Sequence, residues 1–223
     1  MDQPLFNYLD DGINAVIIDN FYTEFQLNEI MKELLWITKP SILLTQENLG
    51  AATSNLTGEY QANKQGVWLE DVFVNWRHSA LMRYCFENFQ DDFIKNKLLS
   101  YNPLMKLMYS CNRRSHLLSY YENAGFYKPH IDSSVFTLLN YFNTEPKKYE
   151  GGDLNLYSFD DRLKRSVSCK TNRVVIITGN TKHEVTDIIA KEKDIFTNGR
   201  YCNAVFLNII SDDDLARMKN NGN

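Results

Sequence analysis

The feature that most constrains the fold of this chain is a series of short β-prone segments in its second half. From about residue 105 onward, runs rich in Val, Ile, Tyr and Phe alternate with turn-forming glycine and asparagine residues. Short strands separated by regular turn signals are typical of a β-sandwich or barrel. We expect strands over residues 115–121, 127–131, 135–142, 153–158, 173–178, 183–189 and 200–210.

The first half of the chain has a mainly helical pattern instead. Thr23 is placed to cap a helix, and Gln26 can complete a capping box with it. A second helix is expected at about 79–98, with Ser79 as its cap and an apolar face that runs to Phe93. Because helices come first and strands later, the order predicts an α+β fold that is mainly β.

We expect a single domain over residues 1–223, because no linker, repeat or low-complexity segment divides the chain. Residues 1–104 would supply helical support, and residues 105–210 would form the β core. The polar segment 40–66 lacks a sustained period, and long loops of this kind are often functional. It is a candidate lid over a substrate.

Trp68 and Trp76 follow that segment and are candidates for the same lid. Ordinary core packing is the better explanation for at least one of them.

The overall charge and hydropathy exclude several broad classes. A net charge of −4 and a pI of about 5.6 argue against an extended contact with nucleic acid or with an anionic membrane. No segment approaches the ~20 apolar residues of a membrane span, and the N-terminus lacks the features of a signal peptide. We therefore expect a cytoplasmic protein with reduced cysteines.

The residues with the clearest chemical meaning lie near the middle of the β-rich half. His130 and Asp132 are two positions apart, and on a strand such residues point to the same face. This pair alone is weak evidence, since any half-exposed strand can carry it. His183 follows the apolar run 174–178 and a turn, so it can face the same pocket. Two histidines and one carboxylate form the facial triad that favours Fe(II) and leaves positions open.

Arg200 opens the last β-prone run, after His183. An arginine at the start of a strand is more often exposed, but a buried one needs an anionic partner. Its planar guanidinium matches a carboxylate with two parallel hydrogen bonds. The distal carboxylate of 2-oxoglutarate is a natural match. The remaining histidines, His78 and His116, have no comparable context and are expected to be structural.

Residues 121–209 resemble the 2-oxoglutarate/Fe(II)-dependent oxygenase superfamily, in its prolyl-hydroxylase-like branch. The resemblance implies a double-stranded β-helix (a jelly-roll, cupin-like core) buttressed by N-terminal helices. It implies Fe(II) as cofactor, with 2-oxoglutarate and O2 as co-substrates, and leaves ascorbate open as a reductant. The matching segments, in chain order, are Y-x-x-x-G-x-Y-x-x-H-x-D (121–132), N-Y-F-N (140–143), G-G-D-L (151–154), N-R-V-V-I-I (172–177), H-E-V (183–185) and G-R-Y (199–201).

By that resemblance, His130, Asp132 and His183 are the metal ligands. Arg200 and Tyr141 would bind the distal carboxylate of 2-oxoglutarate. The resemblance implies no catalytic residue beyond the metal centre.

Three further residues fall where the family lines its co-substrate pocket. These are Tyr121, Tyr127 and Leu154. Each of them, and Tyr141 as well, is equally well explained as an ordinary core residue.

Two departures from the family pattern leave the substrate open. The gap between His183 and Arg200 is longer than usual, and we expect residues 189–198 to form a hairpin extension. Arginine rather than lysine stands at position 200, unlike the collagen-type enzymes. The leading substrate is a prolyl residue in a peptide or protein, with a free amino acid or another small molecule as the alternative. The oligomeric state stays open.

Three other functions compete with this assignment. Nucleic-acid demethylases of the superfamily carry a second arginine where this chain has Phe206, and we do not expect nucleic acid as a partner. A non-catalytic β-barrel that binds a metal or metabolite is the second. A zinc hydrolase is the third, but Glu184, the one nearby candidate base, should point away from the pocket that His183 faces.

Overall fold

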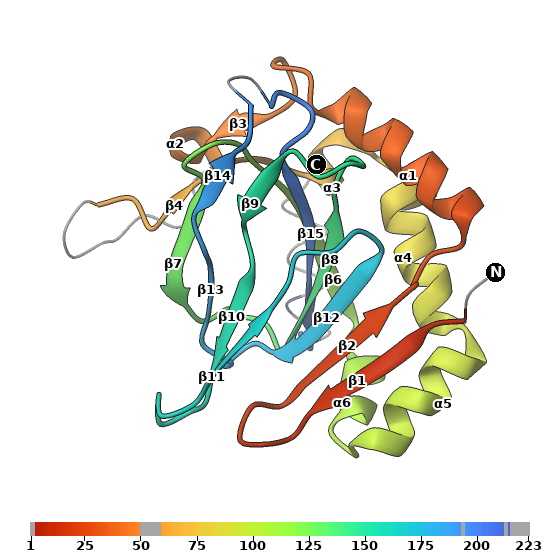
Figure 1. Cartoon of the computed structure of the whole chain (residues 1–223). Coiled ribbons are helices and arrows are strands. Elements are labelled where there is room, and N and C mark those ends of the chain that lie inside the picture. The colour runs from red at the N-terminus through yellow and green to blue at the C-terminus, as the bar shows by residue number, and fades with distance from the viewer. Residues whose placement is uncertain (1–2, 50–58, 193–194, 212–213, 215–223) are drawn as a thin grey trace.

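The predicted β-rich half assembles into two facing antiparallel sheets, shown by the computed structural model in Figure 1. The structure describes residues 3–49, 59–192, 195–211 and 214. The large sheet has the strand order β1-β2-β12-β8-β15-β6-β5-β3, and the smaller one has the order β11-β10-β13-β7-β4. A separate pair joins β14 to β9. The expected double-stranded β-helix of a mainly β fold is therefore confirmed.

The strands are β1 (Leu5–Leu9), β2 (Ala15–Asp19), β3 (Leu44–Thr45), β4 (Ala62–Asn63), β5 (Gln65–Trp68), β6 (Arg113–Tyr121), β7 (Phe126–His130), β8 (Phe136–Phe142), β9 (Tyr149–Gly151), β10 (Leu154–Tyr157), β11 (Lys164–Val167), β12 (Arg173–Thr178), β13 (His183–Val185), β14 (Ile188–Ala190) and β15 (Arg200–Asn208). The helices are α1 (Glu24–Ile37), α2 (Gln46–Leu49), α3 (Leu69–Val72), η1 (Trp76–His78), α4 (Ala80–Gln90), α5 (Asp92–Tyr101) and α6 (Met105–Ser110).

The large sheet is covered on both faces, which explains the nearly continuous apolar runs of its central strands. In β8, Leu138 and Phe142 belong to the cluster under the helices, whereas Leu139 and Tyr141 belong to the cluster between the sheets. This is the period of two expected of a strand. The inner face of the large sheet therefore forms one wall of any site between the sheets.

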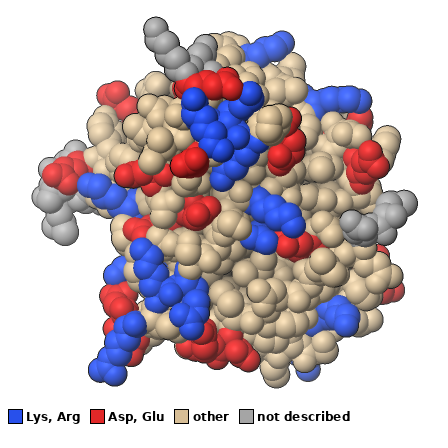
Figure 2. Space-filling view, in the orientation of Figure 1, with Lys and Arg blue, Asp and Glu red and all other residues tan. Residues whose placement is uncertain are grey.

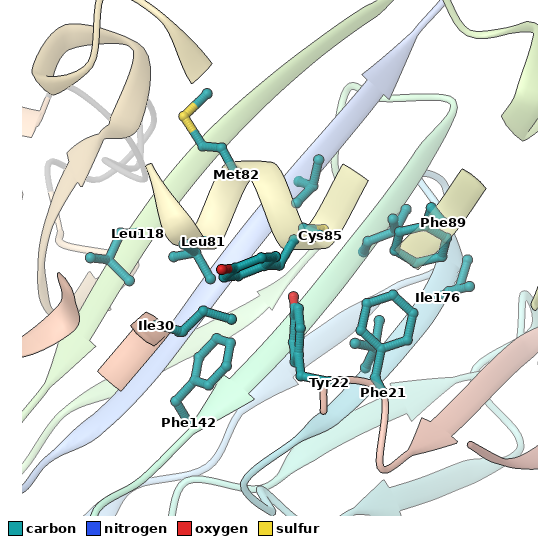
Figure 3. Packing of buried hydrophobic residues seen from close by; sticks show 14 of the residues in the cluster. Phe21, Tyr22, Ile30, Leu81, Met82, Cys85, Phe89, Leu118, Phe142 and Ile176 are labelled. Carbon is teal, nitrogen blue, oxygen red and sulfur yellow. The ribbon is translucent and has the colours of Figure 1, made fainter. Parts of the chain in front are cut away.

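The helices pack against the outer face of the large sheet (Figure 1). Figure 3 shows side chains of α1 and α4 meeting those of the strands, among them Ile30, Leu81 and Cys85 from the helices and Phe142 and Ile176 from the sheet. Burying apolar surface of this extent is the main favourable contribution to folding. The helical layer thus holds the large sheet rigid behind the site.

Local signals in the sequence account for where the helices begin. The capping box of Thr23 and Gln26 is present at the start of α1, and the Ser79 side chain accepts a hydrogen bond from the Met82 amide in α4. The single helix expected at 79–98 is wrong, because Asp91 caps a new helix by accepting from the amides of Phe93 and Ile94. Consequently Phe93 is 42% exposed and does not join the apolar face.

Two expectations for the segment after His183 also differ from the structure. The single strand expected at 183–189 is split into β13 and β14, which lie in different sheets. The start of the expected hairpin extension, β14, pairs with β9 instead of with the residues that follow it. Residues 193–194 of that extension lie outside the described part of the chain.

The N-terminal half contributes strands as well as helices. Strand β2 pairs with β12, and β5 pairs with β6. Within the described residues, no helix is long and apolar enough to cross a membrane. On the face shown in Figure 2, basic side chains lie beside acidic ones over most of the surface.

Two buried polar residues, His116 and Asn203, lie on the helix-facing side of the large sheet. His116 is 2% exposed, and its Nδ1 lies 3.5 Å from the side-chain nitrogen of Asn203. Burial, with a further contribution from the positive charge of Arg114, lowers the pKa of His116 to about 3. The folded protein therefore keeps this imidazole neutral.

His116 should make the protein less stable in mild acid. Below a pH of ~6.5 the unfolded chain binds a proton at this imidazole that the folded chain does not. The stability is thus present above that pH and is lost as the pH falls toward 3. We expect the wild type to lose about 2 kcal/mol between pH 7.5 and pH 5 through this residue, and His116→Gln to lose correspondingly less. Urea unfolding at both pH values measures the difference; identical losses in the two proteins would contradict it.

Candidate metal and co-substrate site

The two candidate metal-binding histidines are brought together by strand pairing. Strands β7 and β13 are antiparallel neighbours in the smaller sheet, and their register sets His183 directly opposite His130. The two imidazole centroids are 4.2 Å apart. Residues that are far apart in the sequence therefore present side-by-side imidazoles to the space between the sheets.

Asp132 reaches the same point from a loop and not from a strand. Strand β7 ends at His130, so the expectation that both residues share one strand face is wrong in detail. Instead, the Asp132 amide donates a hydrogen bond of 2.9 Å to the carbonyl of Gly179. A Cβ at Gly179 would lie 1.7 Å from the Ser134 carbonyl oxygen, so only glycine allows the two loops to approach this closely.

The three side chains form a compact group of possible ligands. Nε2 of His130 lies 3.8 Å from Oδ1 of Asp132, and Nε2 of His183 lies 3.7 Å from Oδ2. One ligand atom from each residue lies within 4.8 Å of the others. His183 is buried, and His130 and Asp132 are partly buried. Three atoms at this spacing can share one metal ion.

Neighbouring groups hold these ligands in the form that binds a metal. Nδ1 of His130 donates to the Lys128 carbonyl at 2.8 Å, and Nδ1 of His183 donates to the Thr181 carbonyl at 2.9 Å. Each bond leaves the lone pair on Nε2 free. Burial, and the neighbouring imidazole, lower the pKa of His130 to about 3. A neutral imidazole is the form that a metal ion requires.

A hydroxyl group orients the carboxylate. Oδ2 of Asp132 accepts a hydrogen bond of 2.6 Å from Oγ1 of Thr137, which is itself 2.8 Å from Oγ of Ser134. Hydrogen bonds of this kind fix a ligand in place. Sequence reasoning missed Thr137, because a threonine five residues after an aspartate carries no signal of its own.

A cavity of about 120 Å³ lies between the sheets and contains all three candidate ligands together with Arg200. Arg200 is 1% exposed. Its Nε donates to the Gly152 carbonyl at 2.8 Å, but its Nη1 is buried without a partner among the described groups. No described acidic residue forms an ion pair with it. A buried guanidinium of this kind is costly unless an anion binds to it.

Gly152 explains the approach of Arg200 to the backbone. Its φ is +70°, and a Cβ there would lie 2.9 Å from Cδ of Arg200. A larger residue would therefore push the guanidinium away from the carbonyl that holds it. This gives a physical role to the second glycine of the G-G-D-L segment.

Of the four other residues expected around the co-substrate, three line the cavity and one does not. Tyr121, Tyr127 and Leu154 line the cavity, and the Tyr127 ring stacks on that of His130 with 3.6 Å between centroids. Tyr141 does not line the cavity; its ring centroid is 4.9 Å from the guanidinium carbon of Arg200. Its buried hydroxyl has no partner among the described groups.

The residues present fit iron(II) and 2-oxoglutarate. Two imidazoles and one carboxylate are the donors of a facial triad, which leaves coordination positions open for other ligands. A dicarboxylate that reaches the metal at one end can meet the unpartnered Nη1 of Arg200 at the other.

The candidate lid is only partly described. Residues 50–58 lie outside the described residues, and the rest of 40–66 contains β3, α2, β4 and the start of β5. Trp68 lines the cavity, and its ring centroid lies 5.9 Å from that of Phe206. Trp76 instead packs on the helical side of the molecule, where its ring centroid lies 5.1 Å from that of Phe86. The expectation of a packing role thus describes Trp76, and Trp68 lies where a substrate could touch it.

The positions of Phe206 and Glu184 bear on two of the rival functions, the nucleic-acid demethylase and the zinc hydrolase. Phe206 lines the cavity where demethylases of nucleic acids carry an arginine. Glu184 points away from it and accepts hydrogen bonds from Tyr157, Asn155 and Lys164. A carboxylate used in this way is not placed to act as a base for a zinc hydrolase.

The candidate site lies in a part of the chain that matches a known protein family. Residues 115–207 match the model of the 2OG-Fe(II) oxygenase superfamily, and this range contains every candidate ligand discussed above. The search of curated proteins found no match to the chain. The family match therefore rests on the segment that builds the site.

Several solved structures share the fold. A prolyl-4-hydroxylase from Pseudomonas putida has a TM-score of 0.61 at 14% identity, covering 89% of this chain and 94% of its own. A prolyl hydroxylase from Trichoplax adhaerens, solved with a peptide of a hypoxia inducible factor, has a TM-score of 0.59 at 16% identity over 86% and 82%. A prolyl 4-hydroxylase from Phytophthora capsici has a TM-score of 0.53 at 18% identity over 92% and 66%. Identities this low establish the common fold and leave the substrate open.

The hydroxyl that orients Asp132 should matter for metal affinity. Thr137→Val keeps the side-chain shape but removes the hydrogen bond, so we expect affinity for Fe(II) to fall by roughly 10- to 100-fold. His130→Ala should lower it further, because it removes a ligand. Anaerobic titration with Fe(II) measures both. Thr45→Val, on the exposed strand β3, is the control, and equal affinities for it and Thr137→Val would contradict the role of Thr137.

Proposed function

We propose that this chain, whose residues 115–207 match the 2OG-Fe(II) oxygenase superfamily, hydroxylates a prolyl residue in a peptide or protein. It is a dioxygenase whose cofactor is Fe(II) and whose co-substrates are 2-oxoglutarate and O2. We propose His130, Asp132 and His183 as the metal ligands. We propose Arg200 as the residue that binds the distal carboxylate of 2-oxoglutarate.

The observation that carries the proposal is a buried guanidinium without a counter-ion in the cavity of the triad. Nη1 of Arg200 is buried and has no partner among the described groups, although the residue is almost wholly inaccessible. A triad alone would also suit a metal-binding module. A triad together with a buried arginine that lacks an anionic partner supports an enzyme that binds a dicarboxylate at its metal.

The protein residues contribute binding, orientation and exclusion of water. When bound, iron(II) with its co-substrates supplies the oxidising power to replace a C–H bond by C–OH. Asp132 is held by Thr137, and the two imidazoles by backbone carbonyls, so the ligands need little rearrangement when the metal binds. Burial raises the pKa of Tyr127 to about 12, so its hydroxyl stays protonated beside His130.

We propose that the hydroxyl of Tyr141 assists Arg200, although the Tyr141 side chain does not line the cavity. Burial raises the pKa of this tyrosine well above its usual value, which keeps the proton available for donation. The partnerless hydroxyl is compatible with a carboxylate held by Arg200. For Leu154, Tyr121 and Tyr127 we propose contact with the co-substrate from the cavity wall.

A second hollow supports a peptide as substrate. It has a volume of about 430 Å³ and shares Trp68, Asp132 and Phe206 with the metal-site cavity. Ile131 and Ile209 add apolar surface, and both are more than half exposed. Apolar walls beside the metal suit the ring of a proline, and the open side leaves room for the flanking chain. The structural neighbours that are prolyl hydroxylases point to the same class of substrate.

Turnover of 2-oxoglutarate is the direct test of this function. With Fe(II) and O2, the wild type should form succinate, and Asp132→Ala should lower the rate by at least about 100-fold, because it removes the anionic ligand. Arg200→Met should raise the KM for 2-oxoglutarate by roughly 10- to 100-fold, since it removes a charge-assisted contact. Robust succinate formation by Asp132→Ala would contradict the triad assignment.

The substrate is tested separately with proline-containing peptides. Mass spectrometry should show the gain of one oxygen atom on a prolyl residue in the presence of 2-oxoglutarate. Oxygen gain only on free amino acids or other small molecules would replace the prolyl-peptide proposal with the small-molecule alternative.

A further inference from the structure

The metal-site cavity contains a second buried cation that the proposed function does not use. Lys64 lies between β4 and β5 and is 7% exposed. Its side chain lines the same cavity as His130 and Arg200. Its Nζ is 3.0 Å from Oγ of Ser119. Sequence reasoning missed it, because it stands in a polar segment with no motif around it.

The surroundings of Lys64 do not neutralise its charge. No described carboxylate lies within ion-pair distance of its Nζ. The Tyr127 ring lies 4.8 Å from Nζ and offers only its π face. An ammonium group has three donors, and Ser119 satisfies one. Burying such a group costs free energy that a methionine in its place would not.

Lys64 remains largely charged at neutral pH. Burial lowers its pKa to about 8, and the charge of Arg200 acts in the same direction. Arg200 on β15 and Lys64 between β4 and β5 thus face one small cavity, with Asp132 as the one acidic residue among its described lining residues. The buried charge of Lys64 would be compensated by an anionic group on a bound ligand.

The charges in the cavity leave room for more than 2-oxoglutarate. Iron(II), Asp132, Arg200 and Lys64 together carry three positive charges, and 2-oxoglutarate neutralises two of them. The distal carboxylate is already matched by Arg200. One positive charge therefore remains for a further carboxylate, and Lys64 is the group without a partner.

We propose that Lys64 is a second carboxylate-binding residue of this cavity, distinct from Arg200. The inference rests on the proposed function and narrows its substrate class. The carboxylate belongs either to the substrate, as in a C-terminal proline, or to the metal-binding end of 2-oxoglutarate. The uncompensated charge favours the substrate.

The test compares ligand binding by Lys64→Met, Lys64→Arg and the wild type, each loaded with Mn(II) so that no turnover occurs. Calorimetry measures the affinities for 2-oxoglutarate and for 2-oxobutyrate, which keeps the 1-carboxylate but lacks the distal one. With 2-oxoglutarate present, it then measures N-acetyl-L-proline and its uncharged analogue N-acetyl-L-prolinamide. Lys170→Met, an exposed lysine paired with Asp19, is the control.

Two results would support the proposal and identify the source of the carboxylate. For a substrate carboxylate, Lys64→Met should weaken N-acetyl-L-proline by roughly 10- to 100-fold and leave the amide and both oxo-acids unchanged. For the 1-carboxylate, it should weaken 2-oxoglutarate and 2-oxobutyrate alike. In either case Lys64→Arg should retain most of the affinity, since it keeps the charge.

Two results would overturn the proposal. The first is equal binding of all four compounds by the wild type and Lys64→Met. The second is an equal loss in Lys64→Met and Lys64→Arg together with a lower melting temperature, which would make Lys64 a structural residue. Failure of the wild type to bind 2-oxoglutarate at all would contradict the proposed function itself, and so the two failures are distinguishable.

Discussion

The pairing of β7 with β13 is the constraint on which the rest of the site depends. The register of these strands sets His183 opposite His130, and a slip by one residue would turn an imidazole out of the cavity. Asp132 joins them only because its loop is tied to the backbone at Gly179. The large sheet, held rigid by the helices behind it, supplies the opposite wall and Arg200.

Charge is the second organising element of the cavity. Arg200 and Lys64 are both buried, and neither has an acidic partner among the described residues. Replacing buried charges by apolar side chains of similar volume is often neutral or stabilising, so stability alone does not explain these two cations. Their presence beside the candidate metal ligands supports ligands that carry carboxylates, one for each cation.

The sequence predicted much of this arrangement, since the relevant signals are local. Alternation and turn residues located the main strands, and the cap at Thr23 located the first helix. The break at Asp91 was missed, because an apolar stripe runs through it at helical spacing while the cap decides the boundary. Asp132 was expected beside the two histidines and lies there, but it was placed on a strand that ends before it, at His130.

What the sequence could not predict depends on long-range packing. Lys64 carries no motif, and only the pairing of β4 with β7 and of β5 with β6 brings it to the cavity. Likewise, Tyr141 matches the family motif but lies next to Arg200 without lining the cavity. Contacts of this kind are set by the tertiary fold, and spacing along the chain does not encode them.

We propose that one cavity holds iron(II) through the triad and 2-oxoglutarate through Arg200. Anaerobic titration of the Fe(II)-loaded protein with 2-oxoglutarate, followed by the visible charge-transfer absorption of the chelate, tests both parts together. We expect the absorption in the wild type, its loss in Asp132→Ala, and a weaker affinity for 2-oxoglutarate in Arg200→Met. No absorption in the wild type, or an unchanged affinity in Arg200→Met, would contradict it.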